Sequence, residues 1–76
     1  MLKQNDVVVY PNPAAKQLTI SATNNITDVA ICNLMGQVVY EQEYNARKVV
    51  VNVAELPRGM YLLKINGVVV KKFIKQ

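Results

Sequence analysis

The stretch MYLLKINGVVVKKFIK, residues 60–75, decides the fold of this chain. At its centre stands Asn66-Gly67, and both middle residues of a type I′ turn need a positive φ, which Asn and Gly tolerate best. Apolar runs flank the pair on both sides, so the stretch predicts a β-hairpin with strands over Met60–Ile65 and Val68–Lys75. The first strand alternates cleanly. Each face of the second mixes lysine with bulky apolar side chains, so alternation does not tell which of its faces is buried.

Short runs of Val, Ile, Leu and Tyr also fill the chain before this hairpin, and they recur at roughly ten-residue spacing between Pro, Gly or Asn. No window shows the apolar spacing of an amphipathic helix. This pattern predicts an all-β fold, an immunoglobulin-like antiparallel β-sandwich of about seven strands. Besides the two hairpin strands, we expect strands at Val7–Tyr10, Gln17–Ser21, Asp28–Asn33, Gln37–Glu43 and Lys48–Val53.

The expected connections carry the residues that such connections need. Pro11-Asn12-Pro13 ends the first strand, because two prolines remove backbone donors. Asn24-Asn25 suits a turn between the second and third strands, and Asn33-Leu34-Met35-Gly36 suits a type I turn closed by a left-handed Gly. Leu56-Pro57-Arg58-Gly59-Met60-Tyr61 resembles the corner of an immunoglobulin-like sandwich, where a Leu packs into the core and the Tyr hydrogen-bonds back to the backbone.

Composition argues against catalytic and metal chemistry. The 76 residues, 51% of them apolar, suffice for one small core, so we expect a single domain over residues 1–76. The chain has no His and a single Cys, Cys32, which leaves no intrachain disulfide, no Cys/His metal cluster and no usual base for a nucleophile. Glu41 and Glu43 share one face of a strand, where they solubilise an exposed edge. We therefore expect neither an enzyme nor a bound cofactor.

Charge and hydropathy limit the kinds of partner that this chain is expected to bind. The net charge of +4 lies in residues 39–76, and three lysines fall in the last six residues. Lysines on an edge strand deter unwanted strand pairing, and only Phe73 accompanies them as an aromatic, so we do not expect nucleic-acid binding. The longest apolar runs have four residues, too short for a membrane-spanning helix. Residues 1–6 lack the apolar stretch of a secretory signal, so we expect a piece of a longer protein.

Several of these motifs together resemble a known family, the C-terminal sorting domains of the type IX secretion system, also called the Por secretion system. The resemblance covers roughly residues 8–76, and its motifs occur in the family's order. It departs at Cys32, near which the family often has Tyr or Phe. The matching elements are Tyr10-Pro11-Asn12-Pro13 with Leu18-Thr19-Ile20, Val29-Ala30-Ile31 with Asn33 to Val39, Leu56 to Tyr61, and Lys71-Lys72-Phe73-Ile74-Lys75.

The resemblance implies a secretion signal carried at the C-terminus of a larger cargo protein. Such domains pass through the periplasm, are bound by the outer-membrane translocon, and are removed by a surface sortase, after which the cargo is secreted or attached to anionic lipopolysaccharide. The terminal strand is then the candidate for direct recognition by the translocon, through Lys71, Lys72, Phe73, Ile74 and Lys75. The other matched positions act structurally: Pro11, Asn12 and Pro13 in their motif, Gly36, Gly59 and Gly67 through backbone geometry, and Leu56 and Tyr61 through packing.

Recognition of a folded signal favours a terminal strand with an accessible edge, which supplies main-chain donors and acceptors to a partner. An open edge also allows a monomer or a weak edge-strand dimer. The alternative function is an immunoglobulin-like spacer or binding module of an extracellular adhesin or enzyme, because one fold serves many functions. A sorting domain must end its protein, whereas a spacer can lie anywhere.

Overall fold

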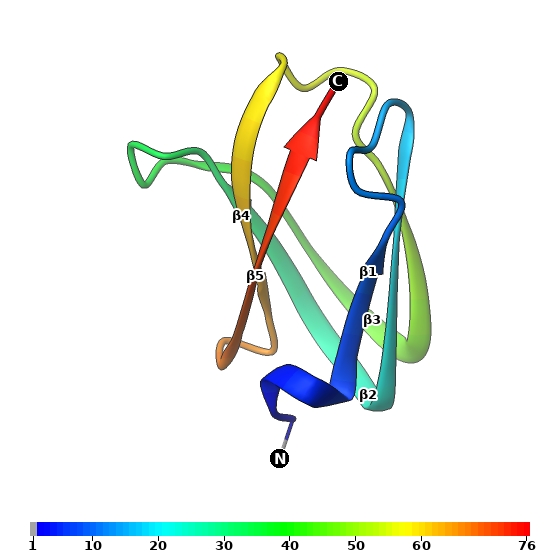
Figure 1. Ribbon diagram of the computed structural model, residues 1–76. Coiled ribbons are helices and arrows are strands. Elements are labelled where there is room, and N and C mark those ends of the chain that lie inside the picture. Colours follow the sequence, from blue (N-terminus) through cyan, green and yellow to red (C-terminus); the bar gives the residue numbers. More distant parts are fainter. Residues whose placement is uncertain (1) are drawn as a thin grey trace.

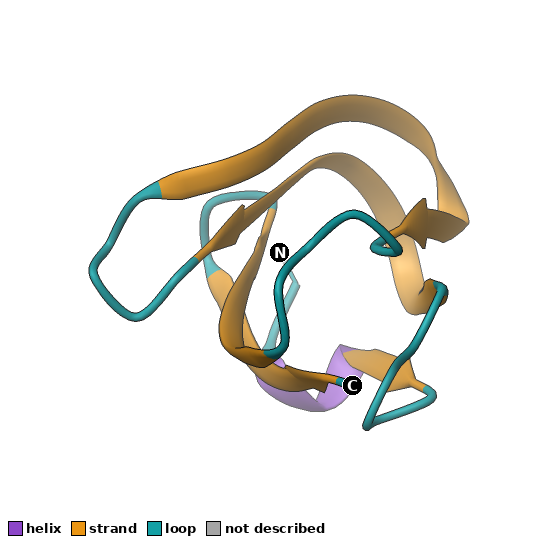
Figure 2. Ribbon diagram, turned by 90° about the horizontal axis from the view of Figure 1, so that it is seen from above, coloured by secondary structure: helices purple, strands orange, loops and turns teal. Residues whose placement is uncertain are grey.

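The computed structural model describes residues 2–76 and consists of five β-strands and one short 3-10 helix (Figure 1). All strand pairs are antiparallel, and all five strands belong to a single sheet. Seen from above, this sheet curls round on itself (Figure 2). The elements are the 3-10 helix η1 (Gln4–Asp6), β1 (Val7–Tyr10), β2 (Gln17–Cys32), β3 (Val38–Asn52), β4 (Gly59–Ile65) and β5 (Val69–Lys75).

The long strand β2 organises the sheet. One of its edges pairs with β3 from Gln17 to Cys32. Its other edge pairs with β1 in the first half and, from Val29 to Cys32, with β4 in the second half. Strand β5 then adds to the far edge of β4. On this second edge the two halves of β2 therefore pair with different strands, and the bend between the halves lets the sheet curl around a core.

The prediction of about seven strands is wrong, although the all-β antiparallel class is confirmed. The runs on either side of Asn24-Asn25 join into β2, and the next two runs join into β3, so the expected turn at Asn24-Asn25 does not form. The stretch from Ser21 to Ile26 instead faces only Lys48 to Ala46 on β3, which is a β-bulge that bends the strand without ending it. With one sheet and five strands, the immunoglobulin-like sandwich is not confirmed.

The hairpin between β4 and β5 forms at the predicted turn, although β5 begins at Val69 rather than Val68, and it also supports the bend of β2. Asn66 has φ 55° and Gly67 has φ 71°, as a type I′ turn requires. The Asn66 side-chain oxygen accepts hydrogen bonds from the backbone N–H of Thr27 (2.7 Å) and of Asp28 (3.3 Å) and from the Thr27 hydroxyl (3.1 Å). Its amide nitrogen donates to the carbonyl of Asn25 at 2.9 Å. One turn residue thus holds the bulged part of the central strand.

Two further local predictions are confirmed. The N–H of Gly36, which has φ 86°, donates to the carbonyl of Asn33 at 3.0 Å and closes the turn between β2 and β3. The Tyr61 hydroxyl donates to the carbonyl of Pro57 at 2.6 Å, and Leu56 is partly buried against the core. The corner before β4 therefore has the hydrogen bond that the sequence indicated.

The core fills the inside of the curl with aliphatic side chains from every strand. Phe73 stacks on Tyr61 with ring centroids 5.5 Å apart and an angle of 20° between the ring planes. Leu2, which precedes η1, is 6% exposed and belongs to the same cluster. The buried members are Leu2, Val7, Ala14, Leu18, Ile20, Ile26, Val29, Ile31, Val49, Val51, Val53, Tyr61, Leu63, Ile65, Val69 and Phe73.

Candidate functional site

The terminal strand β5 divides the candidate recognition residues between its two faces. Phe73 is 0% exposed and Lys75 only 7% exposed, so both lie on the inner face. Lys71 lies on the same face and is half-buried. Lys72 and Ile74 point outward, and Ile74 is 44% exposed. Of the five residues predicted to contact the translocon, only these two present freely exposed side chains, whereas Phe73 is part of the core.

The beginning of the outer edge of β5 is covered by the side chain of Gln4. Its Nε2 donates to the carbonyl of Val70 at 2.9 Å, and the N–H of Val70 donates back to its Oε1 at 3.1 Å. These two bonds imitate a neighbouring strand, because they satisfy both backbone groups of one residue. The ammonium group of Lys71 adds a bond to the carbonyl of Gln4 at 2.6 Å. Three hydrogen bonds thus connect Gln4 to Val70 and Lys71 at the beginning of β5.

The end of the same edge is covered by the loop between β1 and β2. The Asn12 amide accepts from the N–H of Ile74 at 2.9 Å and donates to the carbonyl of Lys72 at 3.4 Å. The N–H of Ala14 donates to the carbonyl of Ile74, and its carbonyl accepts from the N–H of Gln76, both at 2.8 Å. The expectation of an accessible edge is therefore wrong: the strand is held on both edges, and only its outer face is open.

The remaining motif residues lie where backbone geometry or packing explains them. Gly59 has φ 150° at the start of β4, a conformation that other residues rarely adopt. A Cβ added at Gly36, Gly59 or Gly67 would meet no atom within 4 Å, so backbone conformation rather than space selects glycine there. The peptide bonds preceding Pro11 and Pro13 are both cis and leave Asn12 between them, beside β5.

The sequence did not reveal that the side chains of Gln4 and Asn12 bond to the edge of β5. Gln4 belongs to no motif, and its partner lies 66 positions away in the chain. Asn12 was identified, but only as part of a strand-ending motif. An Asn between two prolines only weakly indicates a side chain that bonds to the free edge of a strand, because the neighbouring sequence does not show which strand that is.

Little else in the structure resembles a chemical site. The Tyr40 and Tyr44 hydroxyls hydrogen-bond to each other, and burial, together with this bond, raises the pKa of Tyr44 to about 12. Cys32 is half-buried and has a free thiol. Within residues 2–76, no group of three or more His, Cys, Asp or Glu side chains could hold a metal ion. In the same residues, no helix has the length and apolarity to cross a membrane.

Two curated proteins are similar to this chain, and both are lyases. The ulvan lyase NLR42 of Nonlabens ulvanivorans is 39% identical over 63 residues, which cover 80% of this chain. An endo-acting ulvan lyase of Formosa agariphila is 33% identical over 64 residues, which cover 82% of it. The chain spans only 12% of the length of either relative. The similarity therefore concerns one segment of each lyase.

One family model matches nearly the whole chain. Its description is secretion system C-terminal sorting domain, and it matches residues 8–76, from the second residue of β1 through the end of β5. The match agrees with the resemblance carried by the motifs between Tyr10 and Lys75. This chain belongs to the family of type IX secretion system C-terminal sorting domains.

Proposed function

We propose that this chain is the non-catalytic export signal of a larger cargo protein, and that it directs the cargo across the outer membrane by the type IX secretion system. The observation that carries the proposal is the family match over residues 8–76. The two lyases support it, because in each of them the segment similar to this chain is a small part of a longer protein. A folded domain of this size can act as an export signal without altering the chemistry of its cargo.

The proposal includes three steps. The domain folds in the periplasm, the translocon of the outer membrane binds it as a folded body, and a sortase at the cell surface then removes it. The compact core supports recognition of a folded shape, since the sixteen buried apolar side chains among residues 2–76 give the domain a defined surface rather than a linear motif. The cargo then stays at the cell surface or is released.

A reporter fusion tests the export step. A fluorescent protein with an inner-membrane export signal is fused in front of residues 1–76 and expressed in a bacterium with the type IX machinery and in the same strain without its outer-membrane translocon. We expect the reporter at the surface or in the medium of the first strain and in the periplasm of the second. Periplasmic retention in both strains, with the tail folded, would contradict the proposal and favour the spacer or binding module.

The mass of the exported reporter tests the removal step separately. Cleavage by a sortase shortens the fusion by up to about the 8.5 kDa of this chain. An exported reporter of full mass would leave the export step standing and contradict the cleavage step.

A further inference from the structure

The accessible part of the terminal hairpin is one face, formed by alternate residues of β4 and β5. Across the two strands the register pairs Met60 with Ile74, Leu62 with Lys72, and Lys64 with Val70. Met60, Val70 and Ile74 are each between 41% and 44% exposed. We call these six side chains the outer hairpin face. It is an apolar surface on which two lysines stand.

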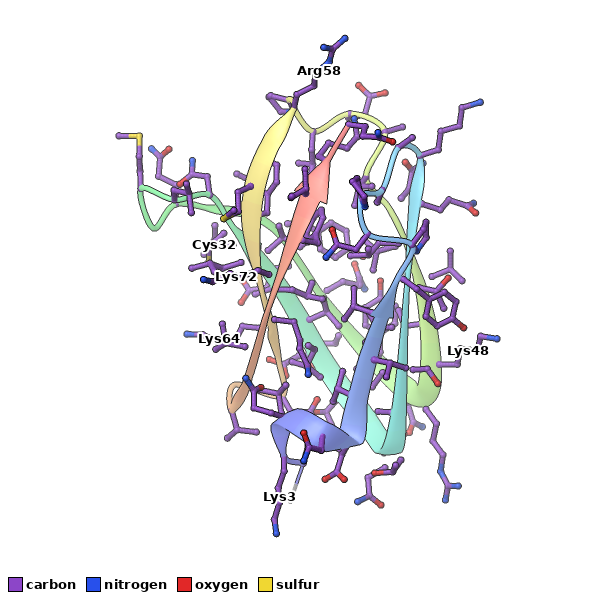
Figure 3. All side chains as sticks on the ribbon, viewed as in Figure 1. Lys3, Cys32, Lys48, Arg58, Lys64 and Lys72 are labelled. Carbon is purple, nitrogen blue, oxygen red and sulfur yellow. The ribbon has the colours of Figure 1, made fainter. Side chains whose placement is uncertain are left out.

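The charge of this face is all of one sign. Residues 59–76 contain four lysines and no Asp or Glu. Two of the four turn inward, where the ammonium of Lys71 donates to the carbonyl of Gln4 and that of Lys75 to the carbonyl of Gln76. The other two, Lys64 and Lys72, are exposed and extend from the same side of the hairpin (Figure 3).

We propose that the outer hairpin face is the surface by which the export machinery binds this domain, and that it docks onto an apolar surface of the machinery that carries carboxylates. The proposal rests on the proposed function. Charge complementarity selects the occupant, because Lys64 and Lys72 attract carboxylates and speed the encounter with them. A second copy of this chain would bring four like charges together, which disfavours self-association through the same face.

Docking through this face differs from the addition of a partner strand to β5. Strand addition needs free backbone groups along an edge. Here the side chains of Gln4 and Asn12 and the backbone of Ala14 already bond to that edge from Val70 to Gln76. A partner that binds the outer face leaves all these bonds intact, so the domain is recognised without rearrangement of its strands.

Charge and apolar variants of the reporter fusion test the proposal. The double variant Lys64→Glu/Lys72→Glu reverses the charge of the face, and Met60→Thr/Ile74→Thr removes apolar surface while keeping residues that suit a strand. The matched controls are Lys48→Glu, an exposed lysine on the opposite side of the molecule (Figure 3), and Val8→Thr, an exposed valine of β1. The purified tails are melted in parallel to confirm that each variant folds.

We expect each face variant to lower the ratio of exported to periplasmic reporter by about tenfold or more, as removal of central contacts does in other interfaces. The controls should stay within about twofold of the wild type, since isolated exposed contacts contribute little. Face variants that fold and are exported as well as the controls would overturn the docking surface and leave the proposed function intact. Retention of the wild-type fusion would refute the proposed function, and the docking surface with it.

Gln4→Ala separates docking on the face from strand addition. It frees the N–H and carbonyl of Val70 at the edge of β5. Face docking predicts unchanged export of a folded Gln4→Ala fusion. Increased export would favour strand addition and overturn the proposal. Sedimentation of the purified wild-type tail as a dimer that the charge-reversed variant abolishes would assign the face to self-association instead, and would overturn it as well.

Discussion

Replacement of Asn66 by glycine should weaken the domain through the bend of its central strand. The side chain of Asn66 makes four hydrogen bonds to Asn25, Thr27 and Asp28, in the part of β2 from Ser21 to Asp28 where the pairing with β3 shifts register twice. Glycine keeps the positive φ of the type I′ turn at this position, so Asn66→Gly removes the four bonds and adds no backbone strain. The substitution therefore isolates what the side chain contributes.

The expected loss follows from these bonds. Each net hydrogen bond contributes about 0.5–1.5 kcal/mol, and the lower value applies to bonds near solvent, so four contribute about 2 kcal/mol. Glycine also loosens the unfolded chain, which adds about 0.5–1 kcal/mol to the destabilisation. For a domain of this size the sum corresponds to a fall in Tm of roughly 10–20 °C. Urea unfolding followed by circular dichroism measures the free energy of unfolding, and a thermal melt measures the fall in Tm.

Asn24→Gly is the matched control, because it makes the same substitution at an exposed position of the same bulge. It should lower the free energy of unfolding by no more than about 1 kcal/mol, the general effect of glycine in a strand. If the two variants unfold within about 0.5 kcal/mol of each other, the side chain of Asn66 does not hold the bend. The destabilisation by Asn66→Gly would then be no more than the general effect of introducing a glycine.

Three other substitutions test the core and the tyrosines. Tyr61→Phe removes the bond to Pro57 and should lower the free energy of unfolding by about 1 kcal/mol; an unchanged urea midpoint would contradict this. Phe73→Ala should remove about 3–5 kcal/mol and abolish the cooperative melt, since Phe73 is fully buried; a folded variant would refute its place in the core. The pKa of Tyr44 is raised to about 12, so its contribution to stability is complete below pH 10 and is lost as the pH rises through 12; Tyr44→Phe should remove that alkaline decline in the urea midpoint.

The features that could be predicted from sequence are those whose partners lie close together in the chain. The turn at Asn66-Gly67, the turn closed by Gly36 and the bond from Tyr61 to Pro57 each involve residues no more than four positions apart. The residues that form each of these features are therefore neighbours in the sequence. The same rule predicts a turn at Asn24-Asn25, which does not form, because two asparagines suit a bulge as well as a turn. The contacts of Asn66, 38 to 41 positions away, decide between the two.

The buried face of β5 was unpredictable for a different reason. Lys71 and Lys75 lie on the inner face with Phe73, and lysine ordinarily marks the exposed face of a strand. Each buries its aliphatic stem and brings its ammonium group to a backbone carbonyl, that of Gln4 or of Gln76. The pattern of apolar and charged residues therefore does not show which face of β5 is buried. The face is determined by the positions of the backbone carbonyls that accept from Lys71 and Lys75.

The segment before β1 is part of the folded unit, although the family match begins at residue 8. Leu2 enters the core, and Gln4 covers the beginning of the outer edge of β5, whose end is covered by Asn12 and Ala14. Exposed strand edges pair readily with other chains, and natural proteins cover them for that reason. The same contact that protects the domain from such pairing leaves the outer hairpin face as the accessible surface of its last strand. If the machinery docks as we propose, the hydrogen bonds of Gln4, Asn12 and Ala14 both protect the edge of β5 from such pairing and leave the outer hairpin face as the recognition surface.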